Sequence, residues 1–529
     1  PLLTCTPYEC QKARCPFYPH ACFVHGARRR AASADVVVTN HSLLLRNVMA
    51  DGRVLPPIRH WVIDEAHGFE AEARRQWARE VAGQDARTAF ELLGGVQTGA
   101  IHTALSHAAH LEAANPAIRV LSQAAAAVSR ASLAMGDFFV VLHDLADAAR
   151  DQGDYETVTL WIDERVRQTP EWAAILEEGE VSAERLDEAS RALADAVALL
   201  ADLDQQEAAN LADAAAFLGE LHASLRLICL GEDESYVYSA QLSRSRRRIG
   251  FESLLAEKID VGDELAARWL MEMKSIVFTS ATMAIGESFE HFEHAVGLDR
   301  LEIGSHSARQ LDSSFDFNDA MSVIVCRDLP VPGMPAYAER LADALFDVHV
   351  AMGGSVLTLF TNRREMGRVY NLLAPRLAAA GLALVQQEKG ASPRRLRERF
   401  MAEKELSLFA LKAFWEGFDA TGDTLRCVVI PRLPFSSPTD PLAGERGLRD
   451  RNAWAKYALP DAVLEVKQAA GRLIRSATDS GVLVLADSRL LSKSYGKVFL
   501  RSLPSQNISI LEVSSIKRYI EMWRRSHRC

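Results

Sequence analysis

Two adjacent carboxylates, Asp64 and Glu65, follow a short apolar run in the stretch HWVIDEAHGF, residues 60–69. The run is typical of a buried strand, so both acids should lie where that strand ends. Ligands of open α/β sheets gather at the carboxyl ends of strands. In the tetrapeptide that ends at His67, Asp64 would hold Mg²⁺ through water, and Glu65 would orient and deprotonate the water that attacks a terminal phosphate. The alternative is an acidic helix N-terminus without a catalytic role.

A phosphate-binding loop of the form G-x-x-x-x-G-K-[ST] does not occur in the sequence. The Gly496-Lys497 pair has no glycine at the required position before it. The chain also begins at Pro1 without a methionine. We therefore expect this sequence to be a piece of a longer protein whose amino-terminal part carries the loop. Alone, the piece should bind ATP poorly and hydrolyse essentially none.

A second group of candidate residues lies near the end of the chain. Gln468, Arg472 and Arg475 are spaced i, i+4 and i+7, which predicts one face of a helix, and Gly471 would permit close backbone approach. Two guanidinium groups on one stripe can bridge a triphosphate held by a neighbouring domain. The alternative is an exposed basic face paired with Glu465.

Four of the eight cysteines lie in the first 22 residues, in the spacing C-x4-C-x4-C-x6-C: Cys5, Cys10, Cys15 and Cys22. Four thiolates in a short proline-rich loop indicate a fold built around a metal. Both [4Fe-4S] and zinc suit such ligands. Disulfides are the least favoured alternative, because the other cysteines are scattered, as in proteins of the reducing cytoplasm.

Cations around this cysteine loop are candidates for DNA contact: Lys12, Arg14, Arg28, Arg29 and Arg30. Cations that meet phosphates, interleaved with aromatic rings, suit single-stranded DNA. We expect each neighbouring aromatic residue to pack over the metal loop instead: Tyr8, Phe17, Tyr18 and Phe23.

The elements that must position these residues belong to an ordinary globular chain of 529 residues, with 48% hydrophobic and 25% charged residues. The net charge of -10 excludes attraction of nucleic acid by the whole molecule, so DNA binding requires local basic patches. No uninterrupted apolar run approaches the roughly 20 residues of a membrane span, and we expect no membrane contact.

The order of elements predicts α/β domains interrupted by a helical insertion. Residues 35–40 (DVVVTN), 60–64 and 275–283 are strand-like, whereas residues 72–230 repeat apolar residues at helical spacing. Breaks are expected near Gly94-Gly95, Pro116, Gly153 and Pro170. After residue 316, six strand-like stretches alternate with helical ones, as in a parallel sheet.

Four motifs occur in a fixed order: DEAH, TSAT at 279–282, FWEGFD at 414–419 and QAAGRLIR at 468–475. Together they resemble those of superfamily 2 helicases. The longer strings SIVFTSATM and AFWEGFDATGDTLRCVVIPRLPF resemble the DinG branch of the XPD-like iron-sulfur helicases. The resemblance spans nearly the whole chain, although the helical insertion matches in position and character only.

The resemblance implies an α/β fold of two RecA-like motor domains, with an iron-sulfur module and an all-helical arch inserted in the first. The domain ranges are then 1–30 for the iron-sulfur module, 31–71 and 251–315 for the first motor domain, 72–250 for the arch and 316–529 for the second motor domain. A [4Fe-4S] cluster, ATP and Mg²⁺ are the implied cofactors.

The resemblance further implies ATP-driven 5′ to 3′ translocation on single-stranded DNA, with forked or 5′-overhang duplexes as substrates, by a cytoplasmic monomer with a role such as DNA repair. By matched position, Thr279, Ser280 and Thr282 would couple nucleotide state to DNA grip. Gly417 and Asp419 would lie at the cleft between the motors, near Gln468 and Gly471. Two alternatives remain: a truncated, non-catalytic DNA-binding protein, and the motor part of a helicase-exonuclease fusion.

Overall fold

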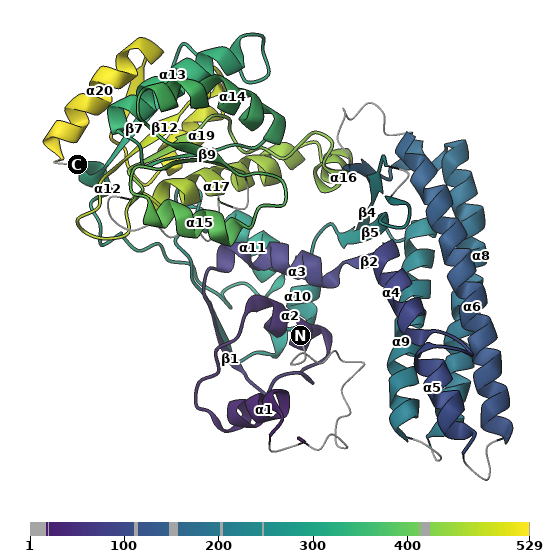
Figure 1. Cartoon of the computed structure of the whole chain (residues 1–529). Helices are drawn as coiled ribbons and strands as arrows, with labels where there is room; N and C mark the ends of the chain where they lie inside the picture. The colour runs from purple at the N-terminus through teal and green to yellow at the C-terminus, as the bar shows by residue number, and fades with distance from the viewer. Residues whose placement is uncertain are drawn as a thin grey trace.

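The computed structural model describes residues 17–18, 21–110, 115–147, 157–201, 205–245, 248–411, 414 and 424–527. Three bodies are visible in Figure 1, each built around its own apolar core. We name them the first lobe (residues 21–77 and 259–315), the helical body (residues 78–258) and the second lobe (residues 316–527). Seven of the predicted site residues lie outside the described residues: Cys5, Cys10, Cys15, Lys12, Arg14, Gly417 and Asp419.

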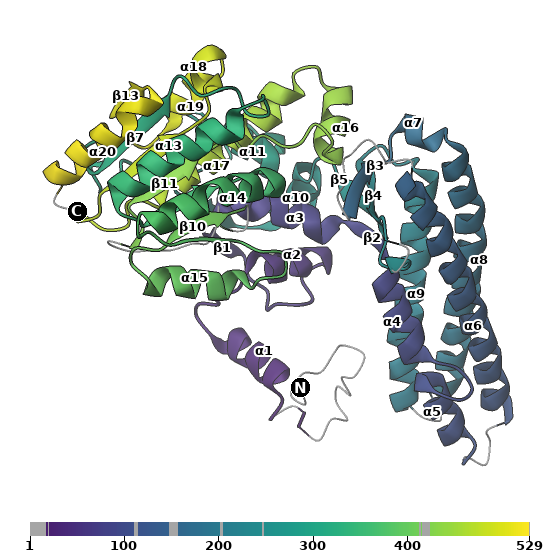
Figure 2. The same cartoon turned by 45° about the horizontal axis from the view of Figure 1, so that its top comes forward.

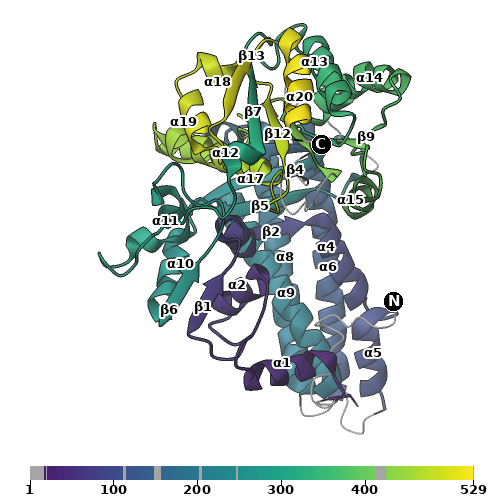
Figure 3. The same ribbon diagram turned by 90° about the vertical axis from the view of Figure 1, so that its left-hand side faces the viewer.

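The first lobe contains two parallel strands, β1 (His60–Ile63) and β6 (Ser275–Phe278), paired so that Ile63 faces Phe278 in register. The two strands lie side by side in Figure 3. Phe69, which is fully buried, packs against Trp269 and Phe278 in the core of this lobe. The surrounding helices are α1 (Phe23–Ser33), α2 (His41–Met49), α3 (Phe69–Trp77), α10 (Gly262–Arg268) and α11 (Glu290–Val296).

The predicted strand at residues 35–40 is wrong, because the structure assigns no strand there. Val36 and Val38 are 79% and 93% exposed, and within the described residues no strand pairs with this segment. β-branched residues favour a strand only where a neighbouring ladder and a buried face reward it. The sequence pattern alone could not supply that neighbour.

The second lobe is a seven-stranded parallel sheet in the order β13-β7-β12-β11-β8-β10-β9. Helices cover both faces, which explains why its inner strands read as continuous apolar runs. In Figure 1, α13, α14 and α20 cover one face, and α15, α17 and α19 cover the other. The strands are β7 (Met321–Cys326), β8 (Val356–Leu359), β9 (Leu384–Gln386), β10 (Ser407–Ala410), β11 (Cys427–Ile430), β12 (Gly481–Leu485) and β13 (Ile508–Leu511).

The helices of this lobe are α12 (Phe317–Ala320), α13 (Tyr337–Met352), α14 (Arg363–Ala379), α15 (Pro393–Ala402), α16 (Pro441–Arg449), α17 (Leu459–Gly471), α18 (Arg489–Ser492), α19 (Gly496–Ser502) and α20 (Val513–Ser526). A π-helical turn, Trp454–Ala458, leads directly into α17. The six strands expected after residue 316 are all present, whereas β13 was not predicted.

The helical body consists of α4 (Gly83–Leu93), α5 (Gly99–Ala108), α6 (Asn115–Asp144), α7 (Glu164–Arg167), α8 (Pro170–Leu200) and α9 (Gln205–Leu230). Three of the predicted breaks coincide with helix ends: Gly94 follows α4, Pro116 lies at the start of α6 and Pro170 opens α8. By length and composition alone, Pro116–Asp144 could cross a membrane, although half of its most apolar window is buried. This segment is not an uninterrupted apolar run, because Arg119, Arg130 and Asp137 lie within it.

The insertion is not all-helical, which corrects the prediction. A four-stranded antiparallel sheet in the order β2-β5-β4-β3 closes one end of the helical body: β2 (Arg79–Ala82), β3 (Thr157–Trp161), β4 (Tyr236–Ser243) and β5 (Ser253–Lys258). Only β4 and β5 follow each other directly; whole helices separate β2 from β3 and β3 from β4 in the chain. Pairing over such distances leaves no local signal in the sequence.

Helix α16 joins the second lobe to this sheet (Figure 2). A Cβ atom added at Gly444 would lie 2.7 Å from the ring of Trp161 in β3, so the helix backbone rests directly on the indole. Arg449 donates a hydrogen bond to the carbonyl oxygen of Glu234 at 2.5 Å. The second lobe therefore contacts both the helical body and the first lobe.

Candidate active site

A cleft of about 2590 Å³ lies between the first and second lobes. Its first-lobe wall includes the end of β1 and much of α3. Its second-lobe wall is formed by residues that follow β8, β11 and β12, and by the π-helical turn and α17. Carboxyl ends of parallel strands thus face the cleft from both lobes, which is the usual position for a ligand in such sheets.

Asp64 and Glu65 line this cleft at the carboxyl end of β1, as the sequence predicts. The strand end is held by backbone hydrogen bonds to its neighbour: Thr279 donates to Ile63 at 2.9 Å, and Ala66 donates to Thr279 at 3.0 Å. Glu65 adopts the left-handed conformation, with φ 49°. Such a backbone is unusual for a residue other than glycine and is found frequently at functional sites.

The acidic motif is tied to the TSAT motif by side chains. His67 Nδ1 lies 2.9 Å from Ser280 Oγ and 3.3 Å from Glu65 Oε2, and Ser280 Oγ lies 3.5 Å from the same carboxylate oxygen. The side chain of Glu65 is 68% exposed, so it stays accessible from the cleft. The structure therefore brings Ser280 against Glu65 and His67, which lie more than 200 positions earlier in the chain.

The second lobe reaches the TSAT motif through α17. Gln468 Nε2 donates to Thr282 Oγ1 at 3.2 Å, and Lys467 Nζ donates to the carbonyl oxygen of Ala284 at 3.2 Å. Burial lowers the pKa of Lys467. Gln468 also lines the cleft, so one side chain of the second lobe both faces the cleft and contacts the first lobe.

Arg472 and Arg475, expected to bridge a triphosphate from one helix face, do not share such a face, which corrects the prediction. Helix α17 ends at Gly471; Arg472 caps it and is buried, and Arg475 lies in the following turn, where its backbone N–H donates to Asp479 Oδ2 at 2.8 Å. Local side-chain to backbone bonds of this kind compete with helix. Neither arginine lines the cleft. A Cβ at Gly471 would meet nothing within 4 Å, so no close backbone approach occurs there.

Only the end of the cysteine loop is described. Cys22 precedes α1, with its thiol free and half-buried, and Arg28, Arg29 and Arg30 are exposed on that helix. Among the described residues, no three His, Cys, Asp or Glu side chains gather as a metal site. Phe17 is 62% and Phe23 is 89% exposed, and the metal loop over which they were expected to pack lies outside the described residues.

Several residues of the cleft were not anticipated from the sequence. Asp487, at the end of β12, is fully buried; it accepts a hydrogen bond from Leu433 N at 3.0 Å and binds Arg489 through both oxygens. Asp487 lies behind the cleft wall, and its partners Leu433 and Arg489 line the cleft, as do these residues: Arg432, Phe435, Arg446, Trp454 and Tyr495. The one feature of the sequence that could have indicated a role for Asp487 is its position just after a strand of the predicted sheet.

Comparison with known proteins gives a consistent family. Residues 345–506 match the Helicase C-terminal domain. The chain is 29% identical to the ATP-dependent DNA helicase YoaA of Escherichia coli, over 95% of this chain and 72% of the relative. It is 31% identical to the ATP-dependent helicase DinG of Mycobacterium tuberculosis, over 93% and 67% of the two chains. It is 25% identical to the 3′-5′ exonuclease DinG of Bacillus subtilis, over 94% of this chain and 54% of that relative.

A solved XPD helicase structure aligns with 88% of this chain and 72% of its own, at 17% identity and a TM-score of 0.48, which is too low to support a conclusion. The extent and identity of the match to the mycobacterial relative are sufficient without it. The chain belongs to the DinG family of helicases.

Proposed function

We propose that this protein is the motor part of an ATP-dependent DNA helicase that couples hydrolysis to 5′ to 3′ translocation on single-stranded DNA. The observation that carries the proposal is the shared cleft. It holds an accessible Glu65, and Ser280 and Thr282 link that carboxylate region to Gln468 of the other lobe. The name of the Escherichia coli relative, an ATP-dependent DNA helicase, supports the same activity.

In this proposal the residues of the first lobe perform the chemistry. Asp64 would hold Mg²⁺ through water, and the ion would neutralise charge on the phosphates. Glu65 would orient and deprotonate the attacking water, while His67 and Ser280 keep its carboxylate in position. Ser280 lies beside Glu65 and also accepts a hydrogen bond from the backbone N–H of Thr282. A change in the bound nucleotide that moves Ser280 would therefore alter the contact between Thr282 and Gln468 of the other lobe.

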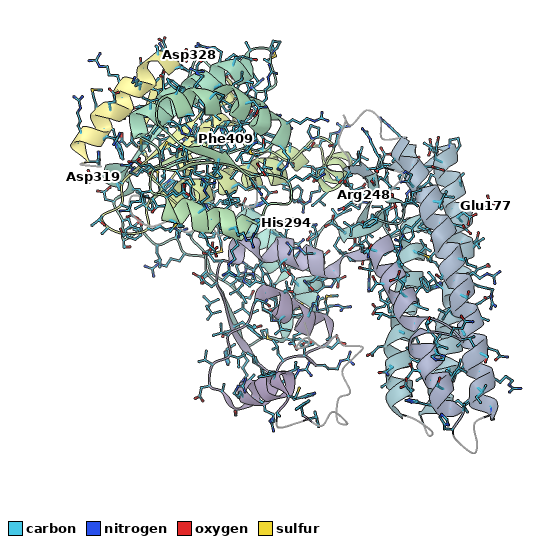
Figure 4. All side chains as sticks on the ribbon, viewed as in Figure 1. Glu177, Arg248, His294, Asp319, Asp328 and Phe409 are labelled. Carbon is cyan, nitrogen blue, oxygen red and sulfur yellow. The ribbon has the colours of Figure 1, made fainter. Side chains whose placement is uncertain are left out.

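The role of Glu65 is tested by Glu65→Gln in the protein assayed with single-stranded DNA. The substitution removes the base but keeps the side-chain volume, so hydrolysis of ATP stimulated by single-stranded DNA should fall by roughly 10²- to 10⁴-fold. Glu177→Gln is the matched control, because Glu177 lies exposed on the outer face of the helical body (Figure 4). Unaltered hydrolysis in Glu65→Gln would refute the role given to this carboxylate.

We also propose that Cys5, Cys10, Cys15 and Cys22 hold a [4Fe-4S] cluster, with Lys12, Arg14 and Arg28–Arg30 contacting DNA beside it. The free, half-buried thiol of Cys22 fits the role of a thiolate ligand. Iron analysis and an absorption spectrum of anaerobically purified protein distinguish a cluster from zinc, because zinc gives no visible charge-transfer band.

We propose that Arg472 and Arg475 stabilise charge on the terminal phosphate, and that Gly417 and Asp419 lie at the cleft between the two lobes. The buried position of Arg472 requires a movement of the lobes before it can reach a nucleotide. A second candidate function is the motor part of a helicase-exonuclease fusion, favoured by the similarity to the 3′-5′ exonuclease DinG of Bacillus subtilis, of which the chain covers 54%. We further propose a cytoplasmic monomer.

A further inference from the structure

The junction of the two lobes contains a histidine whose ring nitrogens both face hydrogen-bond acceptors. His291, on α11 of the first lobe, places Nε2 3.0 Å from Asp461 Oδ1 and Nδ1 3.2 Å from the carbonyl oxygen of Lys456. Both partners belong to the second lobe, at the π-helical turn and the first turn of α17. Figure 4 shows the neighbouring His294, on the same helix, at this junction.

A neutral imidazole has one N–H donor and one acceptor, so it can satisfy only one of two facing acceptors. An imidazolium donates from both nitrogens and satisfies both. Since the side chain of His291 is only 18% exposed, water has little room to replace either bond. The geometry therefore requires the protonated ring when the lobes are in this arrangement.

The acceptor at Lys456 has a cause in the sequence. In a regular helix the carbonyl of Lys456 would accept a hydrogen bond from the backbone of residue 460, but that residue is a proline and has no N–H. The chain forms a π-helical turn at this point instead. The ring of His291 in the first lobe thus faces the carbonyl of Lys456, which cannot form the regular i to i+4 hydrogen bond within its own helix.

The charges around His291 favour the cation. Asp461 faces it from α17 and Glu70 from α3, and Asp260 lies nearby in the first lobe. The nearby cations are each paired with these first-lobe carboxylates: Arg446 of α16 binds Glu70 at 3.2 Å, Arg74 of α3 binds the same carboxylate, and Arg300 binds Asp260. The remaining neighbours are His294 and Tyr457, which lie 3.3 Å apart across the junction. Burial alone would lower the pKa of His291, and Asp461, Glu70 and the hydrogen bond to the Lys456 carbonyl raise it overall.

We infer that His291 is a positioning residue which, as an imidazolium, clamps α11 to the start of α17 and makes closure of the lobes take up a proton. The other end of α17 carries Gln468, which contacts Thr282, so the clamp holds the helix that links the lobes at the cleft. This inference deepens the proposed motor function, because a motor of this kind alternates between open and closed lobes.

The direction of the pH dependence follows from the raised pKa. The clamp is complete below about pH 6.5, the ordinary value for histidine, and is lost as pH rises through the raised value of the closed arrangement. A hydrogen bond to a charged group is strong, but Asp461 is 54% exposed and screened by solvent. We therefore expect a modest effect, roughly tenfold in the closing equilibrium.

Hydrogen-deuterium exchange of the full chain tests the clamp without nucleotide or DNA. After correction for intrinsic exchange, protection of residues 290–296 and 454–461 should fall about tenfold between about pH 6 and about pH 9. His291→Arg keeps a permanent cation and should stay protected at both values. His291→Gln and Asp461→Asn should be poorly protected and independent of pH. His222→Gln, whose ring bonds only to the Ala183 carbonyl within the helical body, should behave as the wild type.

A wild-type profile that does not change with pH overturns the inference, as does a fall that persists in Asp461→Asn or His291→Gln. If His291→Gln fails to fold, the other two variants still decide the question. The readout requires no hydrolysis, so failure of the Glu65→Gln test would leave this result unaffected, and failure here would leave the motor function standing.

Discussion

Two glycines of α16 offer a comparison in which the same substitution should change stability in opposite directions. Gly444 and Gly447 lie in the same helix, and neither has the positive φ that excludes other residues. Alanine in place of a helical glycine removes backbone freedom from the unfolded chain and is stabilising by roughly 0.5–1 kcal/mol. This contribution is common to Gly444→Ala and Gly447→Ala.

The two positions differ in what the new methyl group meets. At Gly447 nothing lies within 4 Å of the added Cβ, so only the helix contribution remains. At Gly444 the Cβ would lie 2.7 Å and 2.8 Å from two carbon atoms of the Trp161 ring. Ordinary contact between carbon atoms is about 3.5–4.0 Å, so α16 and the sheet of the helical body must separate by nearly 1 Å. Overpacking of this kind costs about 1–3 kcal/mol.

Urea-induced unfolding of the two variants and the wild type is the appropriate assay. We expect Gly447→Ala to be more stable than the wild type by up to ~1 kcal/mol, and Gly444→Ala to be less stable by up to ~2 kcal/mol. The difference between the variants cancels the helix contribution and isolates the clash with Trp161. Equal free energies of unfolding for the two variants would refute the contact between α16 and β3.

Two further predictions concern buried groups of the second lobe. Asp487→Ala leaves Leu433 N–H and the guanidinium of Arg489 without their buried partner, so it should lower the free energy of unfolding by about 3–5 kcal/mol. The control is Asp343→Ala, which breaks the exposed pair with Arg376 and should lower the free energy of unfolding by less than ~1 kcal/mol in the same urea titration. Burial lowers the pKa of His349 to about 3, so the fold holds it neutral while the unfolded chain takes up a proton below about pH 6.5. Stability should therefore fall by about 1.4 kcal/mol per pH unit from that group as pH decreases toward 3, and His349→Gln should show a correspondingly shallower acid dependence of its urea midpoint. An unchanged slope in that variant would contradict the neutral, buried state of the ring.

Some of the candidate site could be predicted because its signals are local. Asp64 and Glu65 follow an apolar strand, and the structure places them at the carboxyl end of β1 in the cleft. Gln468 lines the same cleft from the other lobe. The placement of Arg475 failed because Asp479 offers its backbone a competing local bond, and helical spacing does not register such competition.

What the sequence by itself determined is the set of elements whose stability is decided within a few turns of chain: the helix breaks at Gly94, Pro116 and Pro170, and the apolar strands of the second lobe. Tertiary structure alone decided which distant segments pair. The sheet β2-β5-β4-β3, the burial of Asp487 and the clamp at His291 all join residues separated by tens to hundreds of positions. Their free energy comes from burial and from mutual satisfaction of polar groups, and neither exists until the chain has brought those groups together.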